Sequence, residues 1–286
     1  VDELRIAVAE TYDVLVEPSE AAYTLFAQSM DRTGYARGTL SREPGLLAPV
    51  PALDARPWLT MDDMGMGGMD HGAMDHGAMA DMPAMDHSQM AGMDGGAMQG
   101  MDHSAMAGMA MPMQSHPASE TNNPLVDMQA MSTSPKLDDP GIGLRNNGRK
   151  VLTYADLRST FEDPDGREPS RTIELHLTGH MEKFAWSFDG VKFSDAEPIR
   201  LTYGERVRVV LVNDTMMTHP IHLHGMWSDL EDENGQFMVR KHTIDMPPGS
   251  RRSYRVTADA LGRWAYHCHL LYHMEMGMFR EVRVQE

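Results

Sequence analysis

The segment from Met61 to Met113 has a composition that cannot build a folded core. It holds 16 of the chain's 28 methionines and four of its 14 histidines, set among glycine, alanine and aspartate. The unit MDHGA occurs twice in succession and three octads beginning with MD follow, so methionine recurs at intervals of five and three residues. These intervals match neither the helical period nor a heptad. Because the segment has no aromatic or β-branched residue, we expect a disordered Met-rich linker between two folded parts.

The residues before this linker are too few to form a domain of their own. Strand-like runs occur at 4–16 (LRIAVAETYDVLV) and 22–28 (AYTLFAQ), and proline and glycine break the region into short pieces. Two or three strands cannot bury a sufficient core. We therefore expect residues 1–58 to be the end of a domain whose first part lies outside this chain. The linker is expected to span residues 59–140.

Residues 141–286 have the composition of an ordinary folded domain. Strand-like runs occur at 172–177, 184–188, 207–212, 251–257 and 279–284. Turn sequences such as Asn234-Gly235 and Pro247-Pro248-Gly249 separate these runs, and helical periodicity is nearly absent. The pattern predicts an all-β Greek-key barrel or sandwich.

Charge and cysteine content exclude several classes of protein. The formal charge is −17 at pH 7, so we expect no nucleic-acid partner. Cys268 is the single cysteine, which excludes a disulfide framework and a cysteine-rich zinc site. No apolar run approaches the roughly 18 residues of a membrane span, and residues 1–5 do not resemble a signal peptide.

Two histidine clusters near the end of the chain carry the chemistry. The first reads HPIHLHG from His219, and the second reads HCHLLYH from His267, with Met278 shortly after it. Both clusters follow or lie in strand-like segments, where alternate side chains point to opposite faces. On one face we expect four imidazoles, those of His222, His224, His267 and His269. On the other face we expect Cys268 and His219, joined after a short turn by His273 and Met278.

The residue types of the second group indicate a metal centre that transfers one electron at a time. Two imidazoles, a thiolate and a weakly bound axial methionine are the ligands of blue copper. A neighbouring cluster of imidazoles then favours further copper over zinc. Since His267 and His269 flank Cys268, an electron can pass from the thiolate through a few backbone bonds to either imidazole. A lone histidine or a lone buried cysteine is usually structural, but the combined pattern favours copper.

The motifs HPIHLHG and HCHLLYHMEMGM resemble the two carboxyl-terminal copper motifs of multicopper oxidases, a family that includes laccases and cuprous oxidases. The sequences NDTMMTHPIHLHGMW, RKHTIDMPPGS and GRWAYHCHLLYHMEMGMF, with ETYDVLVEP near the beginning, are similar to periplasmic copper-resistance oxidases of the CopA type. The resemblance implies that residues 1–58 end a second cupredoxin domain and that residues 141–286 are the third.

The same resemblance implies a role for each ligand. The type 1 copper ligands would be His219, Cys268, His273 and Met278. The type 2 copper would be bound by His222, and the type 3 pair by His224, His267 and His269. Among these, Cys268, His267 and His269 are the predicted catalytic residues, because they lie on the electron path.

The chain departs from the family in one respect. A complete enzyme holds its trinuclear cluster with eight imidazoles, four of them from two HxH motifs in an amino-terminal cupredoxin domain. This chain has only the HxH motifs at His222 and His267. We therefore expect a carboxyl-terminal fragment that needs the amino-terminal domain as a partner, lacks the export signal and is inactive alone.

The Met-rich linker has a copper chemistry of its own. Thioethers are soft, neutral ligands that favour Cu(I), and aspartate and histidine add affinity for Cu(II). A spacer without function is the alternative. The linker residues that we expect to bind copper are Met69, His71, Met74, His76, Met85, His87, Met101 and His103.

Other residues are weaker candidates. Met226 and Asp229 follow the first histidine cluster, and Met274 and Met276 flank His273. These four could form a Cu(I) uptake site beside the type 1 copper, although packing or surface exposure explains them equally well. We assign no metal to His176, His180 or His242.

The sequence thus predicts a periplasmic copper-dependent oxidase that contains type 1, type 2 and binuclear type 3 copper. It would couple the one-electron oxidation of Cu(I) to the four-electron reduction of O₂ to water, as a means of copper resistance. Two alternatives remain: a copper-sequestering protein without turnover, and a laccase-like phenol oxidase that shares every ligand.

Overall fold

The computed structural model describes residues 1–67 and 113–286. Most of the predicted Met-rich linker, including all eight of its predicted copper ligands, lies outside the described residues. The described residues are almost entirely strands and loops, with one short helix, α1 (Leu271–Glu275). No helix in this described part is both long and apolar enough to cross a membrane.

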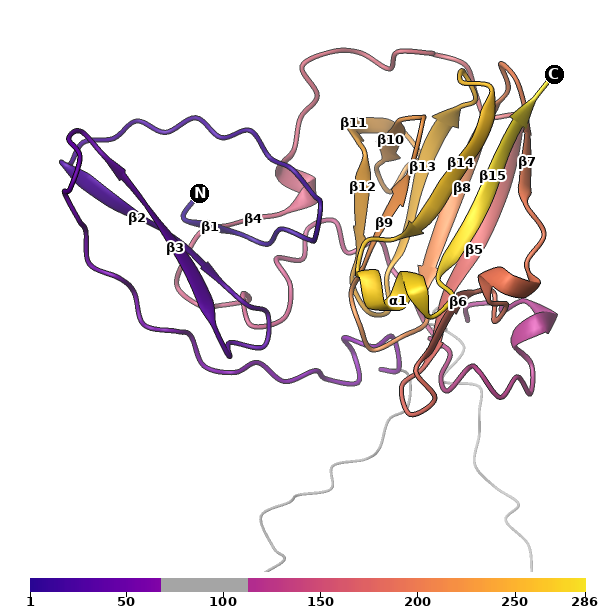
Figure 1. Ribbon diagram of the computed structural model, residues 1–286, viewed down its shortest axis with the longest axis horizontal. Helices are drawn as coiled ribbons and strands as arrows, with labels where there is room; N and C mark the ends of the chain where they lie inside the picture. Colours follow the sequence, from indigo (N-terminus) through magenta and orange to yellow (C-terminus); the bar gives the residue numbers. More distant parts are fainter. Residues whose placement is uncertain (68–112) are drawn as a thin grey trace, which may run out of the picture.

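Two sheets form the β-domain (Figure 1). The six-stranded sheet has the order β11 (Phe237–Lys241), β10 (Ser228–Glu231), β13 (Arg251–Thr257), β8 (Arg206–Asn213), β5 (Arg171–His180) and β6 (Ala185–Phe188). The five-stranded sheet has the order β12 (Thr243–Met246), β9 (His219–Leu223), β14 (Gly262–Cys268), β15 (Phe279–Gln285) and β7 (Ile199–Thr202). Several strands that follow each other in sequence are not paired with each other in these sheets, as in a Greek key.

Apolar side chains from the two sheets meet in one core. Leu177 and Leu211 come from the six-stranded sheet, Ile221 and Ile244 come from the five-stranded sheet, and all four belong to the same buried cluster. Burial alternates along β15, as expected for a strand with one face on a core. The fold is an all-β, cupredoxin-like sandwich, as the sequence predicts.

The predicted strand-like runs are strands in the structure wherever another strand lies beside them to pair with. All five runs predicted within residues 141–286 are strands, namely β5, β6, β8, β13 and β15. The run predicted at 4–16 is wrong in most of its length, because only β1 (Glu3–Leu4) is a strand, paired in parallel with β4 (Val151–Leu152). A β-branched sequence forms a strand only beside a partner, and no other described strand pairs with it.

The region before the Met-rich segment contains a hairpin. The residues that precede this hairpin contact the β-domain through ion pairs. The strands β2 (Ala22–Gln28) and β3 (Tyr35–Ser41) pair with each other in a sheet of two. Glu10 accepts an ion pair of 2.8 Å from Nζ of Lys241, and Arg5 pairs with Asp245 at 2.9 Å.

Residues 113–140, predicted as the end of the linker, lie against the β-domain. Ala130 is fully buried, and Ser134 forms a β-bridge with Ser250. Met131 joins both sides of the 68–112 segment, since its carbonyl accepts a bond of 2.9 Å from the N–H of Gln114 and its N–H donates to Gly65 at 3.0 Å. The domain boundary at residue 140 stays a prediction.

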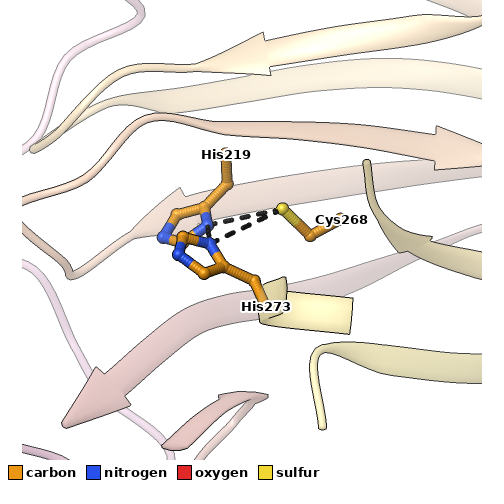
Figure 2. Close-up of side chains that lie close together, drawn as sticks. All are labelled: His219, Cys268 and His273. Carbon is orange, nitrogen blue, oxygen red and sulfur yellow. Dashed lines mark hydrogen bonds between the residues drawn. The ribbon is translucent and has the colours of Figure 1, made fainter. Parts of the chain in front are cut away.

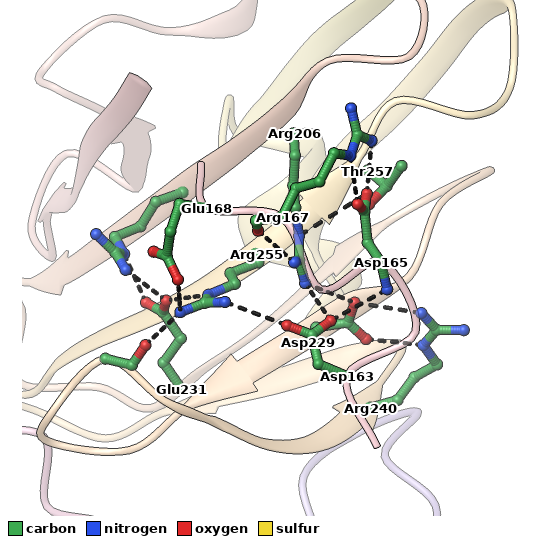
Figure 3. A network of polar contacts seen from close by, with 12 residues as sticks. Asp163, Asp165, Arg167, Glu168, Arg206, Asp229, Glu231, Arg240, Arg255 and Thr257 are labelled. Carbon is green, nitrogen blue, oxygen red and sulfur yellow. Dashed lines mark hydrogen bonds and ion pairs between the residues drawn. The ribbon is translucent and has the colours of Figure 1, made fainter. Parts of the chain in front are cut away.

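An ion-pair network fastens the loop before β5 to the six-stranded sheet (Figure 3). Arg255 lies 3.1 Å from Asp163 of the loop and 2.6 Å from Glu231 of β10. Arg240 of β11 pairs with Asp229 of β10 at 2.7 Å. The carboxylates of Asp229 and Glu231 are buried, so the arginines replace the water that these charges would otherwise need.

Candidate metal centre

The register of two adjacent strands brings the histidine clusters together. In the antiparallel pair of β9 and β14, His267 lies opposite His222 and Cys268 lies opposite Ile221. Because side chains alternate along each strand, Cys268 and His219 face the core while His222 and His267 face the other way. Strand geometry therefore places these four side chains on the two faces that the sequence predicts.

The first group is a buried triangle of three ligand atoms (Figure 2). Nδ1 of His219 lies 3.6 Å from Sγ of Cys268 and 3.1 Å from Nδ1 of His273, and Sγ lies 3.9 Å from Nδ1 of His273. None of the three side chains is more than 3% exposed. Metal–nitrogen and metal–sulfur bonds measure about 2.0 to 2.3 Å, so one ion fits between all three atoms.

The helix α1 and the chain after it bring the backbone of Met278 next to His273 and Cys268. His273 lies on α1, and the N–H of Met278 donates to the carbonyl of His273 at 3.0 Å. The N–H of Cys268 in turn donates to the carbonyl of Met278 at 3.2 Å. Met278 is fully buried. Its backbone therefore lies directly beside that of Cys268.

Two contacts fix the imidazole rings of the triangle. Nε2 of His219 lies 2.7 Å from the hydroxyl of Thr215, which leaves Nδ1 directed at Cys268. The ring of His273 stacks on Trp186, with centroids 4.3 Å apart and planes inclined by 15°. The sequence contained no signal for the role of Thr215, because a threonine four residues before a histidine is common in loops.

Burial sets the protonation of the three side chains. Burial lowers the pKa of His273 to about 4, and burial together with the neighbouring His273 holds the pKa of His219 well below its usual value. Burial raises the pKa of the Cys268 thiol to about 12. At neutral pH both imidazoles are thus ready to bind a metal, whereas the thiol must lose its proton to the ion that it binds.

The second group gathers four imidazoles on the other face. Nε2 of His224 lies 3.0 Å from Nε2 of His267, and the ring centroids of His222 and His269 are 5.5 Å apart. The rings of His222 and His224 are 4.6 Å apart. His224 is exposed, so this cluster opens at the surface of the chain.

Backbone carbonyls orient two of these rings. Nδ1 of His267 faces the carbonyl of Cys268 at 2.9 Å, and Nδ1 of His222 faces the carbonyl of His242. Each carbonyl accepts the Nδ1 proton, which leaves Nε2 free to bind a metal. Burial lowers the pKa of His222 to about 4, so this ring also stays neutral at pH 7. His242, to which we assigned no metal, contributes only its carbonyl.

The four weaker candidates lie in different surroundings. The carboxylate of Asp229 is bound by Arg240, and Met226 belongs to the buried core. Met274 lies in α1 and Met276 directly follows it, both partly buried. Their role in copper uptake stays a prediction, and the arginine contact leaves Asp229 less available for it.

Comparison with known proteins identifies the class of the β-domain. Residues 166–286 match the multicopper oxidase family, whose members use copper as cofactor. The chain is 82% identical over 287 residues to a copper resistance protein A homolog of Pseudomonas syringae pv. tomato. It is 74% identical over 309 residues to copper resistance protein A of Escherichia coli. Both alignments cover all of this chain.

Residues 166–286 thus match the multicopper oxidase family, and the chain as a whole is similar to copper resistance protein A. It spans about half the length of these relatives, 48% and 50% respectively. Among solved structures, the blue copper oxidase of Nitrosomonas europaea is similar, with a TM-score of 0.39 and 19% identity over 44% of this chain and 47% of that one.

Proposed function

We propose that this chain is the electron-accepting part of a copper-dependent oxidase that converts Cu(I) to Cu(II). In this proposal His219, Cys268 and His273, with Met278 as axial ligand, hold the type 1 copper. The observation that carries the proposal is the position of Cys268. Its Sγ faces the buried triangle, while its two sequence neighbours, His267 and His269, belong to the imidazole cluster on the other face.

Copper at these positions would supply one-electron chemistry at the triangle and reduction of O₂ at the imidazole cluster. The protein residues provide the path between them. An electron that reaches Sγ of Cys268 has only the cysteine backbone and one flanking residue to cross before it reaches an imidazole. Burial of Cys268 and Met278 keeps water from the site, and Thr215 and Trp186 hold its rings in place.

In this proposal the oxidase activity also needs imidazoles that this chain does not supply. The four clustered imidazoles, those of His222, His224, His267 and His269, are half of the eight that the resemblance implies for the trinuclear cluster. The exposed edge at His224 is where ligands from an amino-terminal cupredoxin domain would approach. We assign His222 to the type 2 copper and the other three imidazoles to the type 3 pair.

Cu(I) as the reductant is supported by the copper resistance relatives and by the methionine content of the chain. In this proposal the Met-rich segment gathers Cu(I) for the type 1 site, and the protein acts in the periplasm. A sequestering protein would bind copper without consuming O₂. A laccase-like enzyme would consume O₂ with phenols in preference to Cu(I).

The test compares two variants at the type 1 site. Cys268→Ser removes the thiolate, so the intense visible band of thiolate-bound Cu(II) should disappear. Met278→Leu removes only a weak axial bond, so the band should persist while the reduction potential changes. A blue Cys268→Ser variant, or loss of the band in Met278→Leu, would overturn the ligand assignment. In the longer protein, O₂ uptake driven by Cu(I) should fall by orders of magnitude in Cys268→Ser.

A further inference from the structure

A second cluster of histidine and carboxylate side chains joins the segment after residue 112 to the β-domain. It consists of His116, Glu120, His176 and Asp214. Each offers one ligand atom, and these atoms all lie within 4.8 Å of one another. His176 comes from β5, Asp214 directly follows β8, and the other two come from the segment after residue 112. The cluster therefore joins three segments that are far apart in sequence.

The ligand atoms face a common centre. Nδ1 of His116 lies 3.4 Å from a carboxylate oxygen of Glu120 and 3.4 Å from one of Asp214. Nδ1 of His176 lies 2.7 Å from Asp214 and 3.8 Å from Glu120. His176, Glu120 and Asp214 are at most 3% exposed, and His116 is partly buried.

The outer nitrogen of each imidazole is already occupied. Nε2 of His116 lies 3.0 Å from the carbonyl of Ala130, and Nε2 of His176 lies 3.3 Å from the carboxylate of Glu174. Both acceptors hold the ring proton at Nε2 and direct Nδ1 into the cluster. Histidines that bind metals are oriented in this manner, by a carbonyl or carboxylate on the far nitrogen.

Hydrogen bonds orient the two carboxylates as well, and two atoms of the cluster lack a hydrogen-bond partner. Gln129 donates to Oε2 of Glu120 at 2.8 Å, and the N–H of Ala130 donates to Oδ1 of Asp214 at 2.9 Å. Oε1 of Glu120 and Nδ1 of His116 are buried and have no hydrogen-bond partner among the residues that the structure describes. Two buried carboxylates need positive charge beside them. Either two ring protons or one divalent cation supplies that charge.

We propose that His116, Glu120, His176 and Asp214 form a mononuclear site for a divalent transition-metal ion, Cu(II) or Zn(II). Two imidazoles and two carboxylates suit these borderline ions and are poor ligands for Cu(I), which prefers sulfur. The site is separate from the Cys268 triangle and from the four-imidazole cluster. The bound ion fastens the segment that returns from residue 112 onto β5 and β8.

Zn²⁺ binding to the whole chain tests the proposal without reference to oxidase activity. Equilibrium dialysis followed by elemental analysis would count the bound Zn²⁺ in the unaltered chain and in Glu120→Gln and His116→Gln. His180→Gln is the matched control, because it removes a histidine from the same strand as His176 but from outside the cluster. The Cys268 and four-imidazole groups are unchanged in all four proteins, so any difference between them reports this cluster.

Both cluster variants should lose one tightly bound Zn²⁺, whereas His180→Gln keeps it. Zn²⁺ should also raise the thermal unfolding temperature of the unaltered chain more than that of Glu120→Gln. Circular dichroism checks that each variant is folded, and the partly exposed His116 provides a variant that disturbs the core least. The proposal would be overturned if folded Glu120→Gln or His116→Gln bound as much Zn²⁺ as the unaltered chain. It would also be overturned if His180→Gln lost as much Zn²⁺ as the cluster variants. Cu²⁺ added to the same proteins should give an additional nitrogen- and oxygen-ligated paramagnetic resonance signal that Glu120→Gln lacks.

Discussion

The hydroxyl of Thr215 lies 2.7 Å from Nε2 of His219, whose Nδ1 is directed at Cys268. Thr215 donates its own proton to the side-chain oxygen of Asn213 at 2.9 Å, so its oxygen is free to accept from His219. This relay fixes both the orientation of the ring and the nitrogen that carries the proton.

Thr215→Val should therefore weaken metal binding at the Cys268 triangle. The substitution keeps the shape but leaves Nε2–H of His219 without an acceptor, and losses of this kind cost about 10- to 100-fold in metal affinity. Titration with Co(II), followed by the thiolate-to-metal absorption of Cys268, measures the change. Thr218→Val, at a partly buried position nearby, serves as the control. An unchanged affinity in Thr215→Val would show that the hydroxyl does not orient the ring.

The pH dependence of that titration should show a single released proton. The pKa of Cys268 is about 12 and that of His273 is about 4, so between about pH 5 and pH 8 only the thiol gives up a proton to the incoming ion. The apparent affinity should rise about tenfold for each pH unit in this window and more steeply below it, where His273 also binds protons. A slope of two protons within the window would contradict the neutral state of the imidazoles.

Trp186 should contribute strongly to stability because it packs inside the β-domain against His273. Trp186→Ala is expected to lower the free energy of unfolding by about 3–5 kcal/mol. Trp227 is 51% exposed, so Trp227→Ala should change it by only about 0.5 kcal/mol. Urea denaturation of both variants measures the difference, and similar losses in the two would contradict the packing argument.

Glu231 should be needed for stability because Arg208 and Arg255 both bind it. Burial alone would raise the pKa of Glu231, but the hydrogen bonds from the two arginines hold it below its ordinary value. Its contribution is therefore present above the unfolded pKa, near 4.3, and is lost as the pH falls through the lower folded value.

Glu231→Gln should lower the free energy of unfolding at pH 7 by about 3 kcal/mol, since it leaves two arginines without their shared partner. Glu281→Gln is the control, because Glu281 pairs with the largely exposed Arg263 and should have little effect. Denaturant unfolding at pH 7 and pH 4 compares them. A Glu231→Gln variant as stable as Glu281→Gln at pH 7 would exclude a stabilising role for the network in Figure 3.

Replacement of residues 68–112 by a short glycine–serine linker tests the proposed role of the Met-rich segment. The β-domain should unfold at the same temperature, because Met131 holds both flanks in place. The number of bound Cu(I) ions should fall, and in the longer protein the KM for Cu(I) should rise. Unchanged Cu(I) stoichiometry and kinetics would reduce the segment to a spacer.

The parts of the site that could be predicted are those fixed by the regular geometry of single strands. The alternation of side chains along a strand was enough to separate Cys268 and His219 from His222 and His267, because all of them lie in or beside β9 and β14. The cluster of His176 and Asp214 with His116 and Glu120 could not be predicted, since only tertiary packing brings these segments together. The paired state of Asp229 was missed because its partner Arg240 is brought opposite it only by the register of β10 and β11.

The two hydrogen bonds at Met131 hold Gly65 and Gln114, which stand on either side of residues 68–112, close together on the β-domain. The entropy of closing a chain segment between two such fixed ends changes only with the logarithm of its length. Repeats can therefore be added to it or removed from it at little cost in stability and without moving Gly65, Gln114 or the strands beyond them. In the proposed function, copper capacity can therefore change with repeat number, while electron transfer changes separately through substitutions in the β-domain.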